Sequence, residues 1–89
     1  MHVKKQITQS FVLLENEKEY YLEYYIFSEP TQNGNDMYGV EIIQSSGESS
    51  DSALATISSD KEYTLQIILS FAKNFVFPGS LNEIIEEMH

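Results

Sequence analysis

The sequence predicts an α+β fold: a four-stranded antiparallel meander followed by two C-terminal helices packed on one face of the sheet, in the order ββββαα. Residues 3–57 read as short apolar or alternating segments separated by polar turns. Residues 59–76 carry apolar side chains at helical spacing, and a Phe-Pro-Gly break at 77–79 precedes a second helical pattern. Strands followed by helices, with short connections, favour neighbouring strands pairing in chain order.

The first two predicted strands form a hairpin. Residues 3–14 have apolar side chains two or four positions apart, as in a strand with one buried face: Ile7, Phe11 and Leu13. The polar segment 15–18 is short enough for a hairpin turn. Residues 19–28 are the clearest strand, because aromatic and β-branched side chains suit a pleated sheet.

The next two predicted strands are separated from this hairpin by a loop. Residues 29–36 contain a proline, an Asn-Gly pair and an aspartate, each of which favours turn geometry. The third strand covers 37–44, where Gly39 marks a bulge or a close backbone approach. We expect 45–51, which is rich in serine, to be a mobile polar loop, and 52–57 to form a short fourth strand.

The first helix is predicted from a capping box. Ser59 and Glu62 have the spacing of such a box, and the helix should end near Asn74 or Phe75. Its main apolar stripe consists of Leu65, Ile68, Leu69, Ala72 and Val76. A second stripe consists of Tyr63, Ile67, Phe71 and Phe75. Together the stripes are wider than one sheet face can bury, so another surface must cover the second stripe.

A second capping box, Ser80 with Glu83, predicts the terminal helix. Its apolar positions are Leu81, Ile84, Ile85 and Met88. Packed back on the first helix, it would cover part of the second stripe.

Length and charge restrict the classes of function. With 89 residues, the chain has room for one domain, residues 1–89. The net charge is −9, and all five basic residues are lysines. This charge disfavours direct binding of nucleic acids and of anionic membranes, whereas a basic protein partner is compatible with it. The N-terminal residues are polar and no apolar run is long enough to span a bilayer, so we expect a cytoplasmic protein.

Residues for catalysis are scarce. The chain has no cysteine, and its two histidines, His2 and His89, stand at the ends. A metal site at helical spacing is conceivable, but a solvated acidic helix face explains the same residues better: Glu83, Glu86, Glu87 and His89. We therefore expect no catalytic residue, no metal and no cofactor, and we expect that the protein is not an enzyme.

Aromatic side chains on both faces of the second strand make it a candidate partner-binding element. One face carries Tyr20 and Tyr24, the other Tyr21 and Tyr25, and the pattern leaves open which face is buried. Tyrosine is enriched at protein interfaces, although such rings also stabilise a sheet by packing across strands. The candidate partner-binding residues, which include part of the second helical stripe, are Tyr21, Tyr25, Phe27, Tyr63, Ile67 and Phe71.

Three segments carry a family resemblance: Tyr20-Tyr21-Leu22-Glu23-Tyr24-Tyr25, Met37-Tyr38-Gly39-Val40-Glu41-Ile42, and Val76-Phe77-Pro78-Gly79-Ser80-Leu81 before an acidic tail. With them the chain resembles, over most of its length, a small uncharacterised family of Firmicutes, mainly clostridia-like bacteria. The resemblance implies a bacterial, cytoplasmic origin and strands followed by helices. It implies no activity, cofactor or site, because none is assigned to the family.

Two functional hypotheses of different classes follow. The first is a non-enzymatic protein-interaction or regulatory module with an unknown protein partner; a homodimer through the second helical stripe or the tyrosine face is one form of it. The second is an acidic nucleic-acid mimic that occupies the basic groove of a DNA- or RNA-binding protein. One sheet face should then gather Glu15, Glu17, Glu19, Glu23 and Glu41. A small-ligand pocket between sheet and helices is a third option, without a dedicated polar group.

Overall fold

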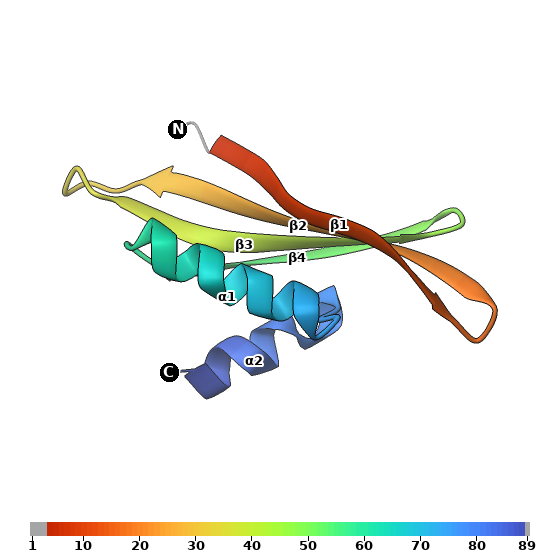
Figure 1. Ribbon diagram of the computed structural model, residues 1–89. Coiled ribbons are helices and arrows are strands. Elements are labelled where there is room, and N and C mark those ends of the chain that lie inside the picture. Colours follow the sequence, from red (N-terminus) through yellow and green to blue (C-terminus); the bar gives the residue numbers. More distant parts are fainter. Residues whose placement is uncertain (1–3, 89) are drawn as a thin grey trace.

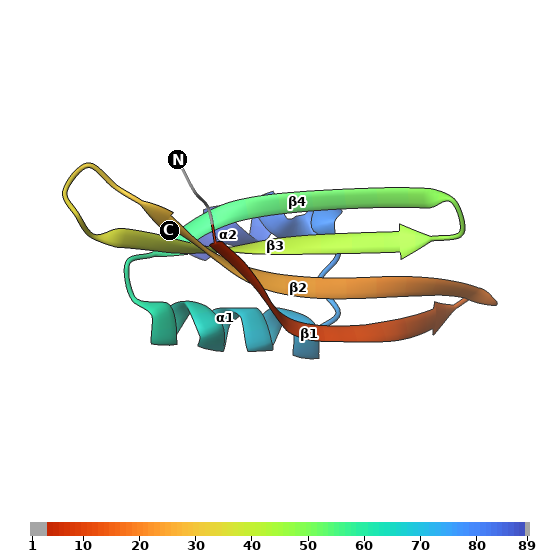
Figure 2. The ribbon, with the colours of Figure 1, turned by 90° about the horizontal axis from the view of Figure 1, so that it is seen from above.

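The computed structural model describes residues 4–88 and contains a four-stranded antiparallel sheet in the order β1-β2-β3-β4 (Figure 1). The strands are β1 (Lys4–Glu15), β2 (Lys18–Pro30), β3 (Asp36–Ser46) and β4 (Ser49–Ser58). They are followed by α1 (Lys61–Lys73), the 3₁₀ helix η1 (Pro78–Ser80) and α2 (Leu81–Met88). Both helices lie on the same face of the sheet (Figures 1 and 2), which confirms the predicted ββββαα α+β fold.

Tight turns make the strands longer than the sequence pattern suggested. Asn16 and Glu17 connect β1 to β2 with φ values of 53° and 66°, which is the geometry of a two-residue type I′ turn. The expectation of a mobile loop over 45–51 is wrong, because β3 runs to Ser46 and β4 starts at Ser49. Gly47, with φ of 59°, allows this second two-residue turn.

The core lies between the helices and one face of the sheet. Alternate residues of β2 and β3 are buried there, namely Leu22, Tyr24, Ile26, Val40 and Ile42. From the C-terminal segment they contact Ile68, Phe71, Ala72, Val76 and Leu81. The buried face of β2 is therefore the one with Tyr24, and Tyr21 and Tyr25 lie on the opposite face.

The helix starts differ from the predicted capping boxes. Asp60, not Ser59, is the N-cap of α1, and its Oδ1 accepts a 3.2 Å hydrogen bond from the backbone N–H of Tyr63. The hydroxyl of Ser58 accepts a hydrogen bond from the N–H of Asp60. This bond holds Asp60 at the start of α1, so the helix begins one residue later than the sequence pattern indicated. Ser80 lies within η1, which continues directly into α2, so Ser80 is not an isolated cap.

The predicted division of α1 into two stripes is wrong. Leu69 of the expected main stripe is exposed, whereas Phe71 of the second stripe is buried in the core. The buried line of α1 consists of Thr64, Ile68, Phe71 and Ala72. The terminal helix α2 packs against β4 and η1 rather than back on α1 (Figure 2). This follows from η1, which contacts β3 and β4 and leads the chain to that side of the sheet.

Candidate functional site

The face of the sheet opposite the helices is not covered by any element within residues 4–88 (Figure 1). We call it the open face. An antiparallel sheet with one solvated face usually has polar side chains on that face. Here, large apolar side chains project from it and are exposed: Ile7, Val12, Leu14, Tyr21 and Leu54. The open face thus combines the composition of a contact surface with access to solvent.

Polar groups of the open face are held in place by one another. The hydroxyl of Tyr25 donates a 3.0 Å hydrogen bond to Glu23, which raises the pKa of Tyr25. Lys5 Nζ lies 2.9 Å from Glu41 Oε1 and 4.8 Å from the centre of the Tyr25 ring. The hydrogen bond to Glu41 raises the pKa of Lys5. The centre of the face therefore presents an ordered arrangement of charges beside the apolar groups.

Phe27 belongs to this face by register but is not available to a partner. It pairs with Gly39 across strands, and its side chain is only 6% exposed. A Cβ at Gly39 would overlap the Phe27 ring and the carbonyl oxygen of Ala55. The ring thus fills the space that the missing side chain leaves, as aromatic residues do opposite glycines in sheets.

The partner-binding residues predicted from the sequence do not form one surface. Tyr21 and Tyr25 lie on the open face, whereas Tyr63 and Ile67 lie on α1, on the other side of the sheet. Tyr63 is exposed and Ile67 is half-buried. Phe71 is 5% exposed and belongs to the core.

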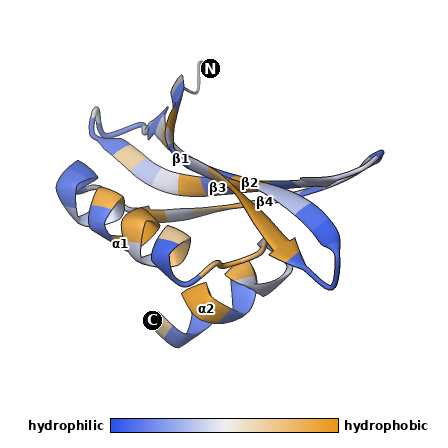
Figure 3. Cartoon of the chain, turned by 45° about the vertical axis from the view of Figure 1, so that its right-hand side comes forward, coloured by the Kyte–Doolittle hydropathy of each residue, from blue (hydrophilic) through white to orange (hydrophobic). Residues whose placement is uncertain are grey.

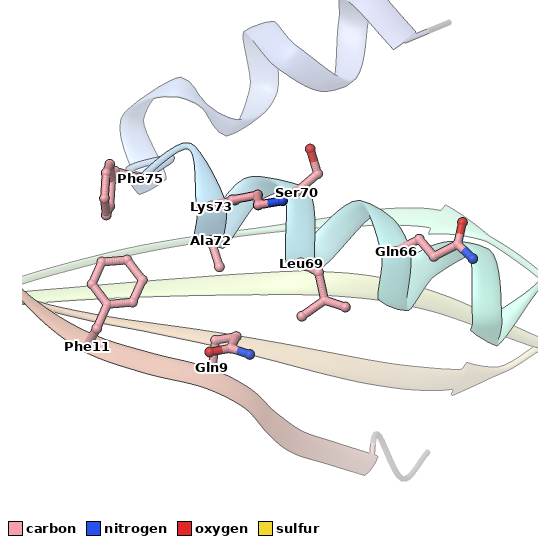
Figure 4. A pocket seen from close by; sticks show the side chains of 8 residues that line it. All are labelled: Gln9, Phe11, Gln66, Leu69, Ser70, Ala72, Lys73 and Phe75. Atoms are coloured by element: carbon pink, nitrogen blue, oxygen red, sulfur yellow. The ribbon is translucent and has the colours of Figure 1, made fainter.

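The sequence suggested a pocket between sheet and helices as a third option but not its place, and the structure has an apolar groove between β1 and α1 (Figure 4). Its volume is about 730 Å³, and Phe11, Leu69 and Phe75 form its apolar walls. Phe75 has φ of 54°, a left-handed conformation that bulky residues rarely adopt. Its ring packs edge-on against Phe11, with 5.5 Å between ring centres. No sequence signal marks this groove, because a left-handed residue after a helix is usually glycine.

A family comparison identifies the chain. The model of the family of unknown function DUF6514 matches residues 3–89. The chain belongs to this family. No curated protein and no solved structure matches it. The expectation of a family of unknown function is confirmed, whereas restriction of DUF6514 to Firmicutes stays a prediction.

The acidic residues of this DUF6514 chain are divided between different parts of the fold. Glu19, Glu23 and Glu41 lie on the open face, with Lys5 beside Glu41. Glu15 shares the helix-facing side of β1 with Leu13, and Glu17 lies in the turn. Three of the five carboxylates named for a nucleic-acid mimic therefore share the open face and two do not, and that function stays a prediction.

Metal ligands, membrane-spanning helices and the two histidines were the remaining features considered from the sequence. Within residues 4–88 of this DUF6514 chain, no three His, Cys, Asp or Glu side chains gather as metal ligands would. None of the helices described there is both long and apolar enough to cross a lipid bilayer. His2 and His89 lie outside the described residues.

Proposed function

We propose that this DUF6514 chain is a non-enzymatic protein-interaction module and that its open face binds a partner protein. The observation that supports this is the row of exposed apolar side chains on the uncovered face, which includes Val12, Tyr21 and Leu54. Soluble proteins rarely leave such a row without a contact to make. Tyr21 combines a rigid apolar ring with a hydroxyl that stays in water, which suits an interface.

The size of the open face fits a protein partner. Four strands at a spacing of about 4.8 Å, with about ten residues each at about 3.3 Å per residue, give roughly 600 Å². Stable interfaces bury about 800 Å² on each partner, with a wide range. The flat face alone approaches this area, and its projecting side chains increase it.

The charges define the chemistry of the partner. Glu19 and Glu23 are carboxylates on this face that form no ion pair within residues 4–88, whereas Lys5 is paired with Glu41 and also feels the charge of Glu23. The whole chain carries a net charge of −9. We therefore infer a partner surface with apolar side chains surrounded by lysine or arginine, which the acidic field attracts over a distance.

Two matched tyrosines test this proposal. Tyr21 on the open face is 49% exposed and Tyr63 on α1 is 46% exposed, so neither truncation leaves a cavity. Tagged wild-type, Tyr21→Ala and Tyr63→Ala chains are used to capture proteins from the native cells. We expect a basic protein that binds wild type and Tyr63→Ala, is lost with Tyr21→Ala, and is released by salt. Hydrogen exchange in the purified complex should then show protection on β2 and β4.

The reverse pattern would overturn the proposal. If captured proteins depend on Tyr63 and not on Tyr21, the helix side is the contact surface. If both variants capture the same proteins as wild type, the open face does not select a partner.

A further inference from the structure

Strand β1 has the composition of a central strand but lies at the edge of the sheet. Residues 11–14 are four consecutive apolar residues, Phe-Val-Leu-Leu, so both faces of β1 are apolar there. Val12 is 53% exposed and Leu14 is 67% exposed. Strands buried on both faces show such runs, whereas edge strands normally carry polar or charged groups that prevent further pairing. The opposite edge, β4, follows that rule with Ser49-Ser50-Asp51-Ser52.

The hydrogen-bonding groups on the free edge of β1 can be assigned from the turn. A two-residue hairpin is closed by a hydrogen-bonded pair, here Glu15 with Lys18. Bonded and non-bonded pairs alternate along an antiparallel ladder. The backbone N–H and C=O groups of Ser10, Val12 and Leu14 therefore point away from β2, toward the free edge.

This half of β1 is regular and accessible. The only shift in its pairing with β2 lies between Ile7 and Gln9, so 9–15 form an uninterrupted strand. Figure 2 shows this half of β1 along the rim of the sheet, extending past the end of α1. Figure 3 shows its apolar end at the same rim.

We propose that β1 binds a second copy of this chain, with the two β1 strands antiparallel and Val12 on the two-fold axis. Val12 then faces Val12 of the second copy, and Ser10 faces Leu14. These are the residues whose backbone groups point outward, so each such pair forms hydrogen bonds in both directions. This register pairs all of residues 9–15, from the shift in pairing after Ile7 to the turn at Asn16. The two four-stranded sheets then form one sheet of eight strands.

Grooves on the helix side receive the side chains of the second copy. The groove of about 730 Å³ lies beside Phe11. A second groove, of about 650 Å³, lies beside Leu13. In the proposed register, Leu13 of the second copy stands opposite Phe11, and Phe11 of the second copy stands opposite Leu13. Phe75 lines both grooves, so its left-handed backbone places a ring where the incoming side chains arrive.

Charge complementarity supports a second copy as the occupant. Lys73 is the charged residue that lines the groove beside Gln9. The register places Glu15 of the second copy opposite Gln9, on the same helix-facing side as Lys73. Two-fold symmetry repeats this lysine–glutamate pair, so the contact gains two ion pairs.

The dimer does not rest on the proposed function, because the backbone edge of β1 forms it, although the Val12 side chain belongs to the open face as well. It has a consequence for that function. A two-fold axis perpendicular to the sheet keeps both sets of helices on one side, so the two open faces form one continuous surface.

Single cysteines test the register, because the chain has no native cysteine. In a hydrogen-bonded pair, Cα atoms lie about 5.5 Å apart, which a disulfide can span. Val12→Cys should therefore form a covalent dimer on mild oxidation. In Ser10→Cys and Leu14→Cys the two sulfur-bearing residues are four positions apart along the strands, roughly 14 Å, and should not be linked. Cross-linking at 10 or 14 but not at 12 would overturn the proposed register.

The second test measures mass and affinity by sedimentation equilibrium. Wild type should show twice the chain mass of 10.2 kDa. Val12→Lys, which places two lysines on the axis, should weaken dimerisation more than tenfold, while Leu54→Lys on β4 should not. Lys73→Glu should weaken it about fivefold, and Lys73→Glu with Glu15→Lys should restore it. A wild-type mass of 10.2 kDa at millimolar concentration, or no effect of Val12→Lys, would disprove the proposal.

Discussion

The hydroxyl of Tyr24 donates a 2.7 Å hydrogen bond to the backbone carbonyl of Val76 inside the core. Tyr24 lies on β2 and is 0% exposed, and Val76 follows the end of α1. A carbonyl just past a helix end has no partner within the helix, and in the core it cannot reach water. This bond therefore fixes the path of the chain from α1 toward η1.

We predict that Tyr24→Phe lowers the free energy of unfolding by about 1–2 kcal/mol, because the Val76 carbonyl is left without a partner in the core. Urea denaturation measures the change. Tyr21→Phe is the control, since the Tyr21 hydroxyl bonds only to the exposed Glu19. An equal effect of the two variants would contradict this reading of Tyr24.

Tyr24 also predicts a loss of stability at high pH. Burial raises the pKa of Tyr24 to about 12, compared with about 10 in an unfolded chain. Between these values the folded protein keeps a proton that the unfolded chain releases, so stability falls as pH rises. The stabilisation is complete below about pH 10 and is lost through about pH 12, by at most ~1.4 kcal/mol per pH unit. Urea titrations at pH 9–12 should show a shallower decline for Tyr24→Phe, and parallel curves would refute the assignment.

The left-handed backbone at Phe75 can be separated from the contacts of its ring. The N–H of Phe75 donates to the carbonyl of Ala72, and the N–H of Val76 donates to that of Phe71. These two bonds form a Schellman motif, in which the left-handed position, here Phe75, is usually occupied by glycine. Phe75→Ala and Phe75→Gly both remove the ring, but only glycine relieves the left-handed strain. We predict that the free energy of unfolding of Phe75→Gly is about 1 kcal/mol larger than that of Phe75→Ala, so the glycine variant is the more stable of the two. Measurements at low protein concentration keep the proposed dimer from contributing to the difference.

Asn74 provides the control for this prediction. Its φ is −101°, so alanine fits there without left-handed strain. Asn74→Ala should therefore be at least as stable as Asn74→Gly, which is the opposite order from Phe75. The same order at both positions would mean that strain at Phe75 is not the cause.

Element types were predictable from the sequence because strands and helices have distinct periods. The aromatic run of β2 and the three- and four-residue spacing in α1 each favoured one structure. The buried face of β2 was not predictable, because Tyr20 and Tyr24 on one side resemble Tyr21 and Tyr25 on the other. Only packing against the helices distinguishes them.

The surfaces depended on tertiary contacts that local patterns do not encode. Phe71 was expected on the second stripe, but α1 turns the line that contains Ile68 and Phe71 toward the core, which buries Phe71 and leaves Leu69 exposed. Phe27 was expected to meet a partner, but Gly39 opposite it provides a place for its ring. The groove beside Phe11 depends on the backbone of Phe75, which the sequence does not reveal.

The turn between β1 and β2 can be improved. Both of its central residues have positive φ, and Glu17 has φ of 66°. Glycine is the preferred residue at this second central position of a type I′ turn. We predict that Glu17→Gly raises the free energy of unfolding by about 0.5–1 kcal/mol and the melting temperature by roughly 3–6 °C. Asn16→Gly should raise the free energy of unfolding by a smaller amount, because asparagine already tolerates a left-handed conformation. A larger gain at position 16 than at 17 would contradict the explanation.

The pairing of Gly39 with Phe27 gives a prediction for the sheet itself. In Gly39→Ala, the new methyl group meets both the Phe27 ring and the backbone carbonyl of Ala55. The ring can move, but the carbonyl is held in the sheet, so we expect a loss of roughly 2–3 kcal/mol in unfolding free energy. In a Phe27→Ala background, Gly39→Ala should cost less unfolding free energy, because the overlap with the ring is gone. The overlap with the Ala55 carbonyl remains, so the loss should still exceed about 1 kcal/mol. Full recovery in that background would show that the ring alone excludes a side chain at Gly39, and no loss in wild type would show that the close approach is absent.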